Sequence, residues 1–217
     1  MDFKITKIEI QKKNLDRVNI YINEEYYFSC HKELVFKLNL KVGSNVDLNI
    51  VNKAIIEDDF IKCKNYALKI IDKTSKTTKQ IKLKLIQKGF SEESILKAIN
   101  FLCEYKFIDD EKYTELYINQ NIKRWGKNKI KYSLITKGID EEIINEYLRK
   151  LDKEDEIEIG KNLALKKYIS IVKTEKDRNK INRKLYSYLI SKGYSFEYAK
   201  SIIDEIMSSK VYDDIDE

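Results

Sequence analysis

A lysine–glycine pair recurs three times in this chain, each time at the same place in a similar stretch of sequence. The three stretches are IKLKLIQKGFSEESILKAI, IKYSLITKGIDEEIINEYL and LYSYLISKGYSFEYAKSII, which begin at residues 81, 130 and 185. Half of the six glycines in the chain occupy this one position, as Gly89, Gly138 and Gly193. A repeat with a period of about 50 residues is typical of folds built from tandem supersecondary units. The repeat therefore constrains the fold more than any other feature of the sequence.

Each copy of the repeat predicts a helix, a tight turn and a second helix. In the first copy, Ile81, Leu85 and Ile86 precede the glycine at a spacing that places them on one helix face. The lysine complements the negative end of the helix dipole, and the glycine suits the left-handed conformation that ends many helices. Side chains that commonly cap a helix N-terminus follow two positions later, as Ser91, Asp140 and Ser195.

A further amphipathic stretch precedes each copy, at residues 61–73, 112–124 and 157–171. Each unit therefore contains three helices. The chain has no proline, and proline is the residue that most strongly interrupts helices. We predict a mainly α protein in which tandem three-helix repeats, each similar to a helix-turn-helix, form an elongated curved array.

The first 60 residues follow a different pattern. Apolar and polar residues alternate over 18–22, and a turn at 23–25 leads to an aromatic run at 26–28, which predicts a β-hairpin. Residues 4–11 are a candidate third strand, and residues 31–40 a short helix, with continuous helix from about residue 49. The predicted domains are a β-rich element with a connecting helix (1–60), three-helix repeats at 61–110, 111–153 and 154–210, and an acidic tail at 211–217.

Positive charge is concentrated in the middle of the chain. Lysine and arginine number 42 against 36 acids, and the whole excess of +6 arises between residues 61 and 153. Residues 73–91 and 116–139 each contain six basic side chains and no acid. We call these stretches basic segment 1 and basic segment 2. They are either solvated helix faces or a surface for nucleic acid or an acidic protein partner.

The candidate partner-binding residues come from both basic segments. Trp125 lies within basic segment 2, where it is either a stacking platform for bases or part of the core. The candidates are Lys79, Lys82, Lys123, Arg124, Trp125, Lys127, Lys129 and Lys131.

The sequence offers little for catalysis. It contains neither a phosphate-binding loop nor a dinucleotide fingerprint, and His31 is the only histidine. The acids at 109–111 are best explained as a helix N-terminus. Three scattered cysteines indicate reduced thiols. We therefore expect no enzyme, no cofactor and no metal site. With no apolar signal core at the N-terminus and no apolar membrane span, we expect a cytoplasmic monomer.

Two stretches resemble a known family. FLCEYKFIDDEKYTELYI at residues 101–118 and KRWGKNKI at residues 123–130 are similar to the matching motifs of the RecX family, which regulates the RecA recombinase. The resemblance covers residues 60–206 well and 1–50 loosely, and the β-rich leader is similar to that of members from low-GC Gram-positive bacteria. The sequence departs from the family at Lys106, where glycine is common, at Asn128, in a stretch that is usually basic or contains proline, and in the weak third repeat.

The resemblance implies a regulator of DNA recombination, DNA repair and the SOS response. Family members bind the RecA nucleoprotein filament and inhibit strand exchange, ATP hydrolysis and co-protease activity. The central basic residues would face acidic recombinase surface, filament DNA or both.

Other functions remain open at this stage. A stand-alone nucleic-acid-binding protein would use the same lysines on phosphates, without base specificity. Arg124 is the only arginine in the two basic segments, which disfavours guanine readout. A purely structural scaffold would bind neither. The sequence does not decide between inhibition and promotion of the recombinase.

Overall fold

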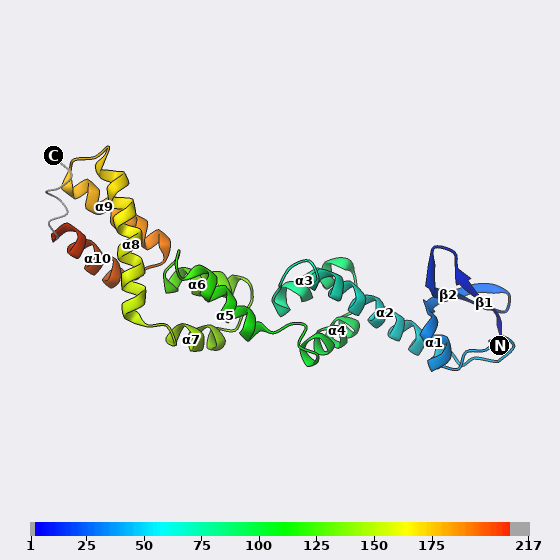
Figure 1. Cartoon of the computed structure of the whole chain (residues 1–217). Helices are drawn as coiled ribbons and strands as arrows, with labels where there is room; N and C mark the ends of the chain where they lie inside the picture. The colour runs from blue at the N-terminus through cyan, green and yellow to red at the C-terminus, as the bar shows by residue number, and fades with distance from the viewer. Residues whose placement is uncertain (1–2, 209–217) are drawn as a thin grey trace. The chain divides into compact units, whose positions relative to one another are not determined.

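The computed structural model describes residues 3–208, and the chain divides into two compact units between Ile108 and Asp109 (Figure 1). The first contains a three-stranded sheet and four helices, and the second contains six helices. The predicted mainly helical fold with a small β element at the N-terminus is confirmed.

The N-terminal sheet is antiparallel, with strand order β1 (Ile5–Gln11), β2 (Asn14–Ile22) and β3 (Glu25–His31). The alternating residues of β2 point into the core, where Val18, Ile20 and Ile22 are almost fully buried. Asn23 and Glu24 both have positive φ, at 50° and 72°, as the tightest hairpin turns require. The predicted hairpin and its third strand are confirmed.

Two helices follow the sheet: α1 (Lys32–Lys37) and α2 (Leu48–Ile71). The continuous helix expected from about residue 49 is confirmed, because Asp47 caps the N-terminus of one uninterrupted helix that contains most of the amphipathic stretch expected at 61–73. The first half of α2 places Val51 and Ala54 in the core under the sheet, and the second half places Cys63 and Ala67 among the next helices. The predicted domain boundary between residues 60 and 61 therefore lies inside α2.

The rest of α2 forms the first three-helix group with α3 (Thr78–Lys88) and α4 (Glu92–Glu104). Thr77 and Gln80 form a reciprocal capping box at the start of α3. Gly89 ends α3 in the left-handed conformation, with φ of 85°, and Ser91 caps α4. The turn has the geometry that the lysine–glycine pair predicts.

The second unit begins with a three-helix group of α5 (Asp110–Asn121), α6 (Lys127–Thr136) and α7 (Glu141–Arg149). Asp109 caps α5 and Asp140 caps α7, as the sequence predicts. Gly138 has φ of 85° in the turn between α6 and α7. The core of this group consists of Ile118, Ile130, Leu134, Ile139, Ile144 and Leu148.

The third three-helix group consists of α8 (Lys153–Val172), α9 (Arg178–Lys192) and α10 (Phe196–Ser208). Gly193 ends α9 with φ of 92°, and the Ser195 hydroxyl accepts a hydrogen bond from the Tyr198 N–H at the start of α10. All three copies of the turn therefore share one conformation. The acidic tail predicted at 211–217 lies outside the described residues, and the other domain ranges remain predictions.

Candidate partner-binding surface

Basic segment 2 folds into the second half of α5, the turn that follows it, and α6. Lys123 and Arg124 lie in the turn with exposed side chains. Neither forms an ion pair or a side-chain hydrogen bond with any residue from 3 to 208. These two cations are therefore available to an acidic partner.

Trp125 is half-buried and packs into the core of the second three-helix group. Its ring centroid lies 6.5 Å from that of Tyr117, and the Lys129 ammonium lies 5.3 Å from the indole centroid. This arrangement favours the core role over an open platform for bases, because two neighbouring side chains already contact the ring.

Lys127 has an internal partner. Its ammonium lies 3.3 Å from a Glu156 carboxylate oxygen and donates a hydrogen bond of 3.1 Å to the Leu151 carbonyl. The other Glu156 oxygen accepts a 3.2 Å hydrogen bond from the Lys127 backbone N–H. The Lys127 side chain is 22% exposed and that of Glu156 only 4%. Glu156 thus acts as the cap that Gly126 cannot supply at the start of α6.

Two more candidates form internal contacts. The Lys129 ammonium donates a 3.0 Å hydrogen bond to the Ser191 carbonyl, and Lys131 forms a 3.1 Å ion pair with Glu141. Basic segment 2 therefore divides into exposed cations in the turn and cations on α6 that stabilise the fold.

The same region brings the backbones of the second and third three-helix groups into direct contact. The Gly126 N–H donates a 2.9 Å hydrogen bond to the Lys192 carbonyl, and the Asn128 N–H donates a 3.2 Å one to the Gly193 carbonyl. A Cβ atom on Gly126 would lie 2.7 Å from the Gly193 carbonyl carbon, and one on Gly193 would lie 2.5 Å from the Lys129 nitrogen. We call this contact, formed by Gly126, Lys127, Glu156 and Gly193, the joint.

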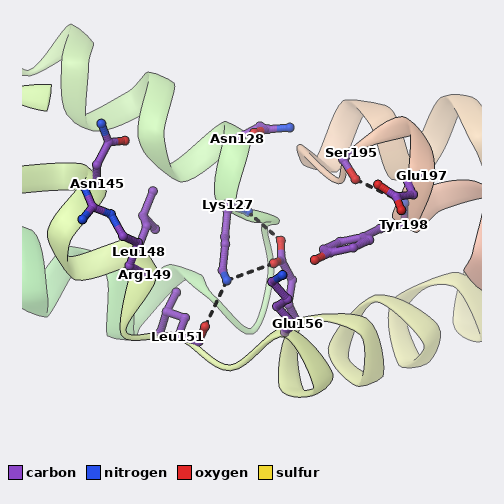
Figure 2. Close-up of a pocket in the computed structure, with 11 residues that line it drawn as sticks. Lys127, Asn128, Asn145, Leu148, Arg149, Leu151, Glu156, Ser195, Glu197 and Tyr198 are labelled. Atoms are coloured by element: carbon purple, nitrogen blue, oxygen red, sulfur yellow. Dashed lines mark hydrogen bonds and ion pairs between the residues drawn. The ribbon is translucent and has the colours of Figure 1, made fainter. Parts of the chain in front are cut away.

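An open groove of about 670 Å³ lies beside the joint, between the second and third three-helix groups. Figure 2 shows Asn145 and Arg149 of α7 on one side and Glu197 and Tyr198 of α10 on the other, with the Lys127–Glu156 pair between them. Lys153, in the first turn of α8, also lines the groove. The lining mixes charged, polar and apolar side chains and is built from both groups.

Basic segment 1 lies in the first unit and forms the loop after α2, then α3 and the turn that follows it. Lys79 and Lys82 are exposed, and neither is paired with another side chain in the described part of the chain. Lys88 lies over the Tyr66 ring, with its ammonium 5.8 Å from the ring centroid. The α3 candidates thus have exposed, unpaired charges, like the two cations of the α5–α6 turn.

The first unit also contains a buried ionic cluster that the sequence analysis missed. Asp58, on α2, accepts hydrogen bonds of 2.9 and 3.0 Å from the Arg17 guanidinium and one of 2.8 Å from the His31 N–H. The Lys62 ammonium lies 2.7 Å from the same carboxylate. Burial opposes ionisation of Asp58, but the hydrogen bonds from Arg17 and Lys62 outweigh it and lower its pKa. The cluster fastens the sheet to α2.

A shared signal could have identified both missed acids. Asp58 follows Val51 and Ala54 on the buried face of α2, and Glu156 precedes Gly160 and Ala164 on the buried face of α8. An acid at a position where the helix period calls for an apolar residue indicates a buried ion pair. The partners, 41 and 29 residues away, could not be predicted this way.

Neither a metal-binding cluster nor a membrane-spanning helix is found among the described residues. Their Cys, His, Asp and Glu side chains nowhere gather into a group of three that could hold a metal ion. No helix among residues 3–208 has both the length and the apolar composition needed to cross a bilayer. Cys30 and Cys63 are buried, and burial raises the thiol pKa values to about 11 and about 12. These two thiols therefore stay protonated and unreactive at neutral pH.

Three models of protein families match the chain. The regulatory protein RecX N-terminal domain matches residues 3–47, the first three-helix domain of RecX matches residues 63–102, and the second matches residues 109–148. Together they span the sheet and the first two three-helix groups.

Curated relatives and solved structures match over most of the chain. Proteins named regulatory protein RecX from Clostridium tetani and Clostridium acetobutylicum are 50% and 48% identical to it, over 95% and 94% of this chain and 95% and 96% of theirs. A crystal structure of regulatory protein RecX matches 93% of this chain and 99% of its own, with a TM-score of 0.74 and 27% identity. RecX from Lactobacillus salivarius matches 69% of this chain and 97% of its own, with a TM-score of 0.62 and 30% identity.

Proposed function

Because the chain belongs to the RecX family of regulatory proteins, we propose that it binds the RecA nucleoprotein filament and inhibits its recombinase, ATPase and co-protease activities. It acts by binding rather than by catalysis, and it works in the cytoplasm, in DNA repair and the SOS response. The observation that carries the proposal is the set of exposed, unpaired cations in a member of this family, namely Lys79, Lys82, Lys123 and Arg124.

These cations suit an acidic assembly for a physical reason. An exposed ion pair contributes little by itself, but several cations that meet one acidic surface together speed association and orient the complex. The cations of α6 contribute less to binding, because Lys127, Lys129 and Lys131 already have internal partners. The filament presents both protein and DNA, so the same four cations support contact with either.

The test is ATP turnover by RecA on single-stranded DNA while the protein is titrated in. We expect turnover to fall with added protein and to recover when Lys79, Lys82, Lys123 and Arg124 are all changed to glutamate. Unchanged turnover with the wild-type protein would contradict the proposal.

A second candidate function rests on the same exposed lysines: sequence-nonspecific binding of bare nucleic acid. Binding to phosphates weakens steeply with salt because counterions are released. A gel shift at two salt concentrations, with and without RecA, separates the two candidates. Tight, salt-sensitive binding to DNA without RecA would favour the second one.

A further inference from the structure

We propose that the groove between the second and third three-helix groups binds an acidic, extended peptide segment of the protein partner. This inference rests on the proposed function, which supplies a protein partner. It assigns one part of the recognition to residues outside both basic segments, chiefly Arg149 and Lys153.

One wall of the groove carries positive charge without internal partners. Arg149 ends α7 and Lys153 begins α8, and both side chains are exposed. Neither forms an ion pair or hydrogen bond with a side chain among residues 3–208. Lys153 stands at the positive end of the α8 dipole, which is an unfavourable place for a cation. Asp152, Glu154 and Asp155 compensate the dipole, but none of them pairs with Lys153, so a bound carboxylate would supply the missing partner.

The opposite wall is the start of α10. Ser195 uses its hydroxyl to cap the helix, and Tyr198 borders the groove one turn later. The first turn of a helix carries partial positive charge, which favours an anionic ligand. Glu197 lies in the same turn and offsets this attraction, so the positive charge that faces a ligand comes from Arg149 and Lys153.

The floor of the groove is already held in place by the joint. Lys127 neutralises the buried Glu156 carboxylate, so that this acid does not repel an anionic ligand. The close approach of Gly126 to Gly193 fixes the separation of the two walls. A preformed groove avoids part of the entropic cost of binding.

The lining fits a peptide better than a nucleic acid. Asn128 and Asn145 border the groove, and no residue in the described part of the chain hydrogen-bonds their side-chain amides. An amide both donates and accepts hydrogen bonds, which matches the N–H and C=O groups of an extended peptide. Glu197 also lines the groove and repels any nearby anion, so it disfavours a strand with a phosphate at every step more than a peptide with an acid at every second residue. Tyr198 is the one aromatic ring among the lining residues, so stacked bases would find little support.

The test is fluorescence anisotropy with a labelled peptide of alternating Asp and Ala, compared with an oligothymidylate of equal charge. The full-length protein should bind the peptide, and Arg149→Glu with Lys153→Glu should weaken this binding about tenfold or more. The matched control is Lys173→Glu with Lys180→Glu, two exposed lysines of the third group outside the groove. The control should stay within about twofold of the wild type, because the groove charges are intact.

A third variant, Gly126→Ala, keeps every charge but forces the joint apart. It should weaken peptide binding as the Arg149 and Lys153 reversal does, while circular dichroism shows that its helices are retained. No binding by the wild type, equal loss in the groove and control reversals, or tighter binding of the oligothymidylate through Arg149 and Lys153 would each overturn the inference. RecA inhibition by wild-type protein in parallel distinguishes failure of this inference from failure of the proposed function.

Discussion

At the scale of single residues, two glycines with the same backbone conformation have different surroundings. Gly89 and Gly193 end α3 and α9 with φ of 85° and 92°. A Cβ atom on Gly89 would meet nothing within 4 Å, whereas one on Gly193 would overlap the backbone of Lys129. The sequence predicts the shared turn, because the lysine–glycine pair is a local signal. It does not predict the contact at Gly193, which depends on a segment more than 60 residues away.

This difference makes a matched pair of variants informative. Gly89→Ala should cost about 1 kcal/mol, the usual penalty of the left-handed conformation for alanine. Gly193→Ala should cost at least about 1 kcal/mol more, because the methyl group also pushes two backbones apart. Both free-energy costs can be measured by urea unfolding, with amide hydrogen exchange followed in α3 for the Gly89 variant and in α9 for the Gly193 variant. Equal costs would mean that the close approach at Gly193 does not exist in solution.

At Lys106 the reverse substitution, to glycine, is informative. Lys106 has φ of 54° at the end of α4 and is exposed, so that a non-glycine residue holds a conformation that suits glycine. We expect Lys106→Gly to stabilise the first unit by about 0.5–1 kcal/mol, the left-handed penalty minus the extra entropy that glycine loses on folding. The midpoint of urea unfolding should rise. A fall in the midpoint would show that the lysine side chain contributes contacts that outweigh the strain.

The Asp58 cluster predicts a specific dependence of stability on pH. Because the folded state lowers the pKa of Asp58, its contribution is present above the unfolded pKa of ~3.9 and is lost as the pH falls through the folded pKa. Asp58→Asn should cost about 3 kcal/mol at neutral pH, because it leaves Arg17 buried without its counter-ion. The gap between variant and wild type should narrow below pH ~4.

The control for this experiment is Glu9→Gln. Glu9 is on the surface of β1, and its pKa is lowered mainly by a hydrogen bond from Lys7. The unfolding curve of the Glu9→Gln variant should match that of the wild type at neutral pH, because an exposed ion pair contributes little to stability. A constant gap between Asp58→Asn and wild type at all pH values would mean that the carboxylate charge plays no part in joining the sheet to α2.

At the scale of elements, the sequence predicted the extent of α2 closely, but it did not predict that the two halves of this helix belong to different cores. The pattern of apolar residues continues through residue 60 without a break, so that the sequence contains no signal for a boundary there. What changes along α2 is its neighbours: Ala54 packs under the sheet and Ala67 packs against α3 and α4. Tertiary packing, which a single sequence does not encode locally, determines this difference.

The lysine side chains of α6 have internal partners, whereas those of Lys123 and Arg124 in the preceding turn have none among residues 3–208. The sequence does not distinguish the two groups, because both are basic residues in one acid-free stretch. Lys127→Glu would place a second carboxylate beside the buried Glu156 and should destabilise the second unit by about 3 kcal/mol or more. Lys123→Glu, four residues earlier and exposed, should change stability by less than about 0.5 kcal/mol. Thermal unfolding of the two single variants provides the comparison. Similar melting temperatures would place Lys127 among the solvated cations instead.

At the scale of the whole molecule, exposed cations on both units are proposed to bind the partner. Lys79 and Lys82 belong to the first unit, and Lys123 and Arg124 to the second. Composition and charge distribution located both basic segments, because clusters of like charge are visible in sequence. Only the fold shows which cations have internal partners, such as the Glu156 and Glu141 carboxylates and the Ser191 carbonyl.

The most direct test of the central claim is ATP hydrolysis by RecA filaments on single-stranded DNA, measured against increasing concentrations of three proteins. These are the wild type, the variant with Lys79, Lys82, Lys123 and Arg124 changed to glutamate, and a control with glutamate at the exposed positions Lys173 and Lys180. We expect the wild type and the control to inhibit ATP hydrolysis at similar concentrations. The fourfold variant should reach the same inhibition only at a concentration at least about tenfold higher, with an unchanged melting temperature. Equal inhibition by all three proteins would contradict the central claim.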